Sequence, residues 1–169
     1  IWDDIQEEFG QTEFIFVAFG KPDQNILDDK WAIAQNQFFT DAILKEVKKV
    51  DKVISLSTFN KIDGTDDFLD IGLLQDENFI KNFGDDVIIN QYLNDIRTYL
   101  DNNPEQRKRL ISTNSDYLNI AIRPIDDSSF SDIVIQVKDL AYKHLGNYDI
   151  HFAGQPYLAG ETPALIKKD

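Results

Sequence analysis

Two parts of this chain carry the same succession of patterns, and this duplication constrains the fold more than any other feature. Residues 13–59 and residues 117–153 each read as a strand, a helix and a second strand. Two such units in one chain are the pattern of the split βαβ, or ferredoxin-like, arrangement. The sequence therefore predicts an α+β domain with an antiparallel four-stranded sheet and both helices on one face.

The first unit opens on a segment that is apolar on both faces. Residues 13–20 read EFIFVAFG and end at a Gly-Lys-Pro turn signal, which predicts a central strand. Residues 28–50 repeat apolar side chains at three- and four-residue steps, which predicts an amphipathic helix with lysines in its last turns. Residues 53–59 are predicted as the second strand.

The second unit has clearer signals for where its strands and its helix begin and end. Residues 117–123 alternate between two faces, and Pro124 ends them because proline cannot donate a ladder hydrogen bond. Ser129 with Asp132 resembles a capping box, which predicts a helix that runs to Leu145. Residues 149–153 are predicted as the fourth strand, with Ile150 and Phe152 facing inward. The predicted faces of the third strand are Leu118, Ile120 and Ile122 on one side, and Asn119, Ala121 and Arg123 on the other.

An insertion of residues 60–116 separates the second and third predicted strands. Its residues 60–70 read as a polar loop, residues 87–100 as a short helix, and Asn103-Pro104 as the start of a further helical turn. We predict one domain over residues 1–169. Its core is 13–59 and 117–153, and residues 154–169 form a connector.

The first strand predicts that the second face of the sheet, opposite the helices, is also covered. Phe14, Phe16 and Ala18 should lie on this second face, where the two predicted helices cannot bury them. Either the insertion covers this face, or a neighbouring domain or subunit does. The polar residues predicted on the same face, as a candidate domain interface, are Tyr117, Asn119, Arg123 and His151.

Charge and composition exclude several classes of function. A net charge of −13 repels phosphate backbones and argues against a nucleic-acid partner. The chain has no cysteine, which excludes a disulfide framework, a thiolate metal site and a cysteine nucleophile.

No motif in the chain predicts catalysis, a metal or a cofactor. A glycine-rich phosphate loop, an HExxH pair and a nucleophile elbow are all absent from the sequence. Residues 63–70 suggest a calcium loop but fail the EF-hand template, because aligning Gly64 puts Phe59 and Lys61 at ligand positions. His144 and His151 lack a second ligand at helical spacing. We therefore expect no enzyme activity and no tightly bound metal.

Four short motifs follow one another along the chain. They are FGQTEFIFV at residues 9–17, VDKVISL at 50–56, LIS at 110–112 followed by Asp116, and AGQP at 153–156. Together they resemble an extracytoplasmic loop domain of the RND superfamily, in the hydrophobe and amphiphile exporter branch that includes the MMPL-type lipid transporters.

This resemblance implies a porter domain between the first and second transmembrane helices of a proton-driven exporter. Such a domain lies on the extracytoplasmic (periplasmic) face of a bacterial inner membrane, captures or channels a lipophilic substrate, and moves with the helices. The implied partners are the transmembrane helices and the second loop domain of the same chain, with a possible homo-oligomer of the parent. The family's proton-relay acids lie in those helices, so no catalytic residue is implied here.

The connector would then transmit force between the domain and the membrane helices. Glycine permits sharp changes of direction and proline fixes the backbone angle φ, which suits this task. The candidate coupling residues are Gly154, Gln155, Pro156, Gly160 and Pro163.

Two other readings compete with the exporter. One is a free-standing ferredoxin-like regulatory module that binds a small ligand at a subunit interface and dimerises through its strand faces. The other is a small enzyme, for which no acid–base pair can be identified by spacing. The exporter reading alone predicts runs of ~20 apolar residues directly flanking this segment in its parent gene.

Overall fold

The computed structural model describes residues 14–61, 63–65, 68–70, 72–125 and 130–154. The first unit consists of β1 (Ile15–Gly20), the short 3-10 helix η1 (Ile26–Asp28), α2 (Lys30–Glu46) and β2 (Val50–Ile54). The insertion contributes β3 (Asp63–Thr65), β4 (Phe68–Asp70), α3 (Asp86–Asn102) and α4 (Pro104–Leu110). The second unit consists of β5 (Tyr117–Pro124), α5 (Phe130–Leu145) and β6 (Asp149–Ala153).

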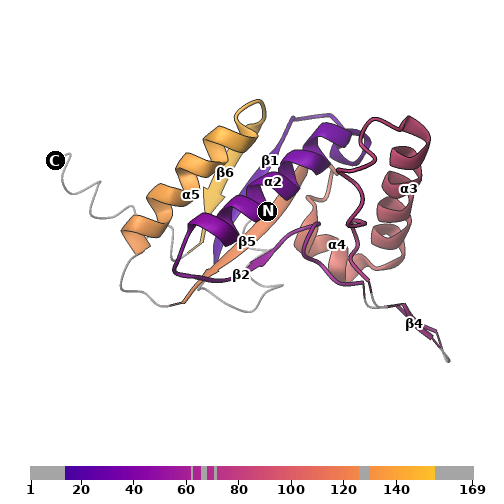
Figure 1. The fold of residues 1–169 in the computed structure, drawn as a ribbon, viewed down its shortest axis with the longest axis horizontal. Helices are drawn as coiled ribbons and strands as arrows, with labels where there is room; N and C mark the ends of the chain where they lie inside the picture. The colour runs from indigo at the N-terminus through magenta and orange to yellow at the C-terminus, as the bar shows by residue number, and fades with distance from the viewer. Residues whose placement is uncertain (1–13, 62, 66–67, 71, 126–129, 155–169) are drawn as a thin grey trace.

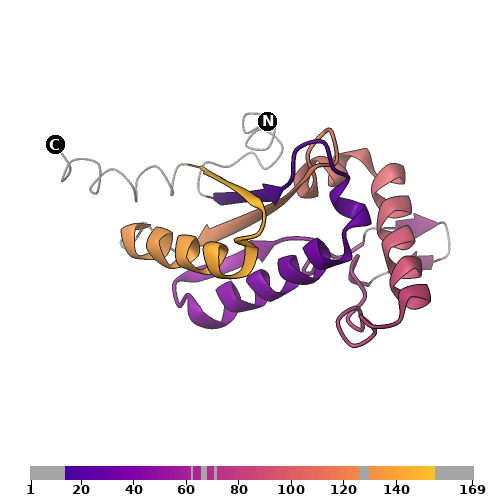
Figure 2. The ribbon, with the colours of Figure 1, turned by 90° about the horizontal axis from the view of Figure 1, so that it is seen from above.

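Strand order confirms the predicted fold class. The four strands lie in the order β2-β5-β1-β6, and every neighbouring pair is antiparallel. This is the ferredoxin-like split βαβ arrangement. The helices α2 and α5 lie on the same side of the sheet, as Figure 1 and Figure 2 show.

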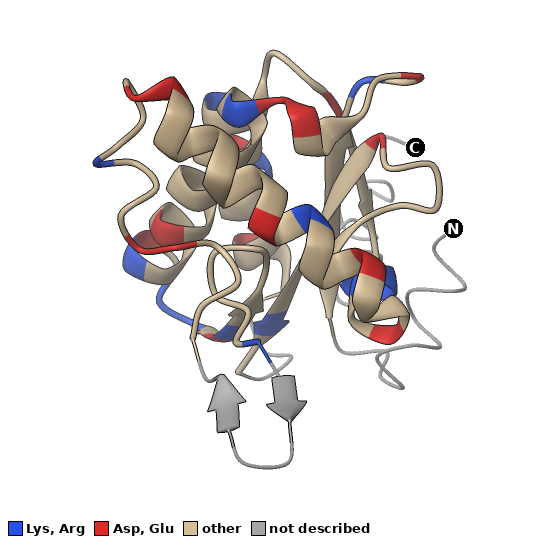
Figure 3. Cartoon of the chain, turned by 90° about the vertical axis from the view of Figure 1, so that its right-hand side faces the viewer, with Lys and Arg blue, Asp and Glu red and all other residues tan. Residues whose placement is uncertain are grey.

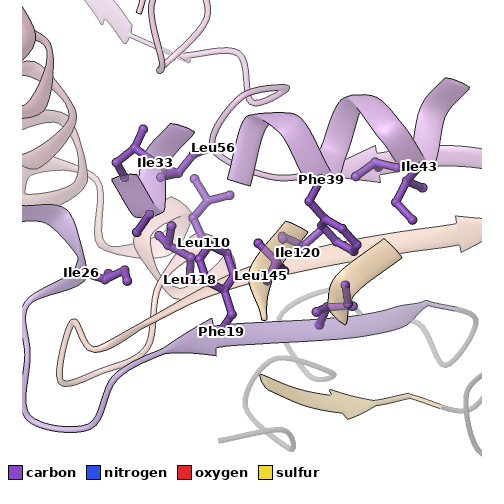
Figure 4. Packing of buried hydrophobic residues seen from close by; sticks show 14 of the residues in the cluster. Phe19, Ile26, Ile33, Phe39, Ile43, Leu56, Leu110, Leu118, Ile120 and Leu145 are labelled. Carbon is purple, nitrogen blue, oxygen red and sulfur yellow. The ribbon is translucent and has the colours of Figure 1, made fainter. Parts of the chain in front are cut away.

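One large apolar cluster lies between these helices and the sheet. Ile15, Val17 and Phe19 of β1 face it, and Phe39 of α2 is fully buried in it. Figure 4 shows side chains from α2, β1, β5 and the end of α5 meeting there. The buried stripe predicted on α5 is confirmed as Ile133, Val134, Val137, Leu140, Ala141 and Leu145.

The insertion extends this main cluster rather than covering the second face. Phe79 and the apolar side of α3 belong to the same cluster as the sheet residues. Arg97 of α3 also donates to the carbonyl oxygen of Leu27 at 2.9 Å and to the Asp28 carboxylate at 2.8 Å. The described part of the insertion is therefore joined to the helix side of the core, which contradicts the reading that it covers the second face.

The second strand begins and ends earlier than predicted. The helix α2 ends at Glu46 because Val47 has an extended backbone, and β2 already begins at Val50. After Ile54 the chain turns: the backbone N–H groups of Thr58 and Phe59 both donate to the carbonyl of Ser55. Residues 55–59 are thus a turn, and their prediction as strand is wrong.

The insertion differs from its prediction in two places. Residues 63–70, expected as a loop, contain the hairpin β3–β4, in which Asp63 pairs with Asp70. The helix predicted over residues 87–100 is present as α3, which begins one residue earlier and ends two residues later; the Asp85 side chain caps its start by accepting a hydrogen bond from Ile88 N. The helix predicted to begin at Pro104 is confirmed. Ser129 of the predicted capping box lies outside the described residues.

Candidate functional site on the second face of the sheet

A small apolar cluster occupies one half of the second face. Phe14, Phe16 and Ala121 form it, and Ile54 and Ala153 pack against them. The two phenylalanine rings stack with centroids 6.0 Å apart, and their residues are only 4% and 1% exposed. The prediction that the second face is apolar and covered is therefore confirmed for this half.

A hydrogen-bonded polar group occupies the corner of the second face where β1 ends. The Tyr117 hydroxyl donates to Asp149 Oδ2 at 2.7 Å, and His151 Nε2 lies 2.7 Å from the same oxygen. Tyr117 is on β5 and Asp149 on β6, with β1 between them, and Gly20 is the residue in register with both. Because Gly20 has no side chain, the tyrosine and the aspartate can meet across the central strand.

Gly20 is also required by the backbone. A Cβ atom added there would lie 1.8 Å from the carbonyl oxygen of Asp116, far inside contact distance. The chain before β5 is held in this close approach by Ser112, whose hydroxyl accepts hydrogen bonds from the backbone N–H groups of Asp116 and Tyr117. Any other residue at position 20 would have to displace this turn.

The corner is electrostatically negative. The pKa of Tyr117 is raised to about 12. The largest cause is burial, followed by the hydrogen bond to Asp149 and the negative charges of Asp149, Asp116 and Asp23. The hydrogen bonds from Tyr117 and then His151 hold the pKa of Asp149 below its ordinary value. The corner thus has the same sign as the chain, whose net charge is −13 and whose acidic residues lie on helices and loops alike in Figure 3. At neutral pH it presents a carboxylate and a neutral phenol.

We expect Asp149→Asn to remove a pH-dependent part of the stability. The folded-state pKa of Asp149 lies below its ordinary value of 3.8, so its contribution is present above about pH 4. It is lost as the pH falls through the folded-state value. The difference in melting temperature between wild type and variant should therefore shrink between neutral pH and about pH 3. Asp139→Asn, an exposed carboxylate on α5, is the control, and a gap for Asp149→Asn that does not change with pH would contradict the assignment.

The candidate residues divide into two groups. Tyr117 and His151 belong to the polar corner, with their rings 5.6 Å apart. Arg123 lies six residues along β5, roughly 20 Å away at the rise of a strand. Its guanidinium pairs with Asp51, to which Nε donates at 2.9 Å. The prediction placed these residues on the correct face, but the structure does not bring Arg123 into the polar corner.

Asn119 lies between the two groups, and its side-chain carboxamide is buried without a hydrogen-bond partner. It is 3% exposed, and neither Nδ2 nor Oδ1 of its side chain has a hydrogen-bond partner. A buried polar group left unpaired costs about 1–3 kcal/mol of stability. The unpaired carboxamide of Asn119 therefore lowers the stability of the folded domain.

Of the predicted coupling residues, Gly154 is described and its glycine is required. Its φ is +106°, and an added Cβ would lie 2.0 Å from the carbonyl oxygen of Phe14. The chain thus leaves β6 in direct contact with the residue that leads into β1. Gln155, Pro156, Gly160 and Pro163 lie outside the described residues.

Three residues of the site were not predicted. Asp149 stands two positions before His151 in the same strand, so the alternation already placed both on one face. Asp51 and Gly20 take part through cross-strand neighbours, and a single sequence does not contain that register. Only the first omission had a signal in the sequence.

Comparison with protein-family models, with curated proteins and with solved structures finds no match to this chain. Among the described residues, no group of three or more histidine or acidic side chains is arranged to hold a metal ion. None of the helices in the described ranges combines the length and apolarity needed to cross a bilayer. The chemistry offered by the second face is hydrogen bonding beside an apolar surface.

Proposed function

We propose that this chain is the extracytoplasmic porter domain of a proton-driven RND-type exporter of lipophilic substrates. In this role the domain performs no chemistry of its own. It takes up or channels substrate and moves as a body with the membrane helices that flank it.

The observation that carries this proposal is the position of the chain entry and exit. The strands β1 and β6 are antiparallel neighbours, and Phe16 pairs with Ala153 near the outer end of the pair. Gly154 packs against the Phe14 carbonyl, so the two connections leave the sheet side by side. A domain carried between two consecutive membrane helices needs this geometry, because both connections must reach the same membrane surface.

The motifs behind the resemblance support the proposal at the level of the fold. Leu56, Leu110 and Ile111 are each at most 2% exposed and belong to the main cluster. Ser55 is fully buried, and its hydroxyl lies 2.9 Å from that of Thr40. These motif residues hold the ends of β2 and the approach to β5, so they are structural positions of such a domain.

Labelling of the parent protein in cells tests the proposed location. We expect Gly84→Cys, in a parent otherwise free of reactive cysteines, to react with a membrane-impermeant maleimide on intact spheroplasts. Gly84 is exposed, and nothing lies within 4 Å of its added Cβ. Ala34→Cys is the matched control: it is 3% exposed and should remain unlabelled until the protein is denatured.

Two outcomes would overturn the proposal. Labelling of Gly84→Cys only after the spheroplasts are lysed would place the domain in the cytoplasm. Parent-gene codons on either side of this segment that encode no run of ~20 apolar residues would remove the membrane helices.

The second face also supports one alternative, a free-standing module that dimerises through this face to bind a small ligand. The accessible residues of this face, Tyr117, Asp149 and His151, would then take part in the dimer contact. Sedimentation equilibrium separates the two, since this alternative requires a stable dimer of the isolated chain.

A further inference from the structure

Exposed lysines gather at the end of the domain where the chain enters and leaves the sheet. Lys45 lies in the last turn of α2, Lys48 and Lys49 lie in the turn that follows, and Lys52 lies in β2. All four side chains are exposed, and we call these four residues the lysine patch. Since the chain has a net charge of −13, the patch departs locally from its overall sign.

The sheet register places the lysine patch beside the chain entry. Val53 of β2 and Ile15 of β1 are both in register with Ile122 of β5, one on each side of it. Lys52 precedes Val53 just as Phe14 precedes Ile15, and β1 and β2 run in the same direction because both are antiparallel to β5. Lys52 therefore lies in the row of the entry residue Phe14, and the exit of the chain lies against the Phe14 carbonyl.

Two exposed apolar side chains accompany the lysines. Ile125 is 61% exposed, and its backbone N–H donates to the Lys49 carbonyl oxygen at 2.8 Å. Leu44 is 50% exposed and immediately precedes Lys45 in α2. Surfaces that bind at the boundary between lipid head groups and acyl chains combine cations with exposed apolar side chains in this way. A bilayer with anionic head groups suits both kinds of residue.

Carboxylates at this end reduce its positive charge without reversing it among the described residues. Asp51 is ion-paired with Arg123. Glu46 and Asp132 line one recess together with two of the lysines, Lys48 and Lys49. The other two lysines of the patch lie outside this recess, so the described part of this end has more cations than carboxylates.

The opposite end of the domain is acidic. It contains the polar corner and the start of α2, which lies about 25 Å from the end of that helix at 1.5 Å per residue. The carboxylates at this end include those of Asp23, Asp28, Asp29, Asp86, Asp116 and Asp149. Lys30 and Arg97, at the same end, are ion-paired with Asp86 and Asp28. The charge of the domain is therefore polarised along α2.

From these observations we propose that the lysine patch, with Ile125 and Leu44, contacts the surface of a bilayer that contains anionic phospholipids. The lysines bind the phosphate groups, the two apolar side chains enter the head-group layer, and the acidic end points away from the membrane. This assignment rests on the proposed function, in which flanking membrane helices bring this end of the domain to the bilayer. It adds the lipid head groups as a partner.

Bicelles of phosphatidylcholine, with and without phosphatidylglycerol, test the proposal on the chain itself. We expect the ¹⁵N NMR shifts of residues 45–52 and of Ile125 to change on titration with the anionic bicelles and to stay unchanged with the neutral ones. The amide of Asp149, in the polar corner, should not shift with either.

Salt should change this binding in two opposite directions. At about 0.01 M salt the screening length is about 30 Å, so the whole acidic chain repels the anionic bicelle. At about 0.1 M it is about 10 Å, which leaves mainly the contact of the lysine patch, and at about 1 M it is about 3 Å, which removes that attraction as well. We therefore expect the tightest binding near 0.1 M.

Replacing three lysines of the patch tests which end binds. The combined variant Lys45→Gln, Lys48→Gln and Lys52→Gln should bind anionic bicelles at least about tenfold more weakly, because each lysine near an anionic surface adds to the affinity. A control with the same net charge replaces three exposed lysines elsewhere by glutamine, namely Lys21, Lys81 and Lys143. This control should not lose affinity.

Ile125→Ser tests the apolar part of the contact separately. We expect it to weaken binding about threefold, because affinity for the interface grows with the apolar area that is buried. Ile125 is exposed, so the melting temperature in the absence of lipid should stay the same.

The proposal is overturned if anionic bicelles do not bind, if neutral bicelles bind equally well, or if the two triple variants lose the same affinity. It is also overturned if inorganic phosphate saturates the same shifts, because the patch would then be a site for free phosphate. Binding of anionic bicelles by a chain whose parent lacks membrane helices would remove the exporter and keep the surface. An extracytoplasmic domain without this binding would remove only the surface.

Discussion

Gly20→Ala is expected to destabilise the domain by about 3 kcal/mol or more, the upper end of the range for overpacking. The added Cβ would lie 1.8 Å from the backbone oxygen of Asp116, and a backbone atom cannot rotate away as a side chain can. The pairing between β1 and β5 must open, and with it the contact of Tyr117 with Asp149. Urea unfolding measures the loss as a shift of the midpoint.

Gly84→Ala is the matched control for this prediction. No atom lies within 4 Å of a Cβ at this position, so its stability should change by no more than about 0.5 kcal/mol. Equal unfolding midpoints for the two alanine variants would mean that the close approach at Gly20 does not constrain the fold.

Phe79→Ala is expected to destabilise the whole domain by about 3–5 kcal/mol. Phe79 belongs to the insertion, is fully buried, and contacts the rings of Phe83 and Tyr92 with centroids 6.2 Å apart. It lies in the same cluster as the sheet residues, so the loss should reach β1 and β5. Hydrogen exchange should show lower protection of the β1 amides, and unfolding should remain a single transition.

Val87→Ala provides the comparison within the insertion. Val87 is 69% exposed at the start of α3, so its truncation should have little effect on stability. If Phe79→Ala lowered protection in α3 alone and left β1 unchanged, the insertion would be an independent folding unit, contrary to the shared cluster.

The sequence was sufficient for the parts of the fold that follow a regular period. The alternation of residues 117–123 placed Leu118 and Ile120 toward the helices and Asn119 on the second face, because strand side chains alternate whatever their neighbours are. The stripe on α5 followed in the same way from the helical period.

Irregular segments were predicted poorly for a physical reason. The Thr58 hydroxyl donates to the Val53 carbonyl and accepts from Ser55 N, which ends β2 through side-chain contacts that have no period. Strands of three residues, such as β3 and β4, are too short to show an alternation at all. The paired state of Arg123 and the unpaired state of Asn119 depend on neighbouring strands, so both needed the sheet register.

The contact between Gly154 and Phe14 has a practical consequence. Because the chain enters and leaves the sheet at neighbouring residues, the domain can be inserted into a surface loop of a host protein without widening that loop.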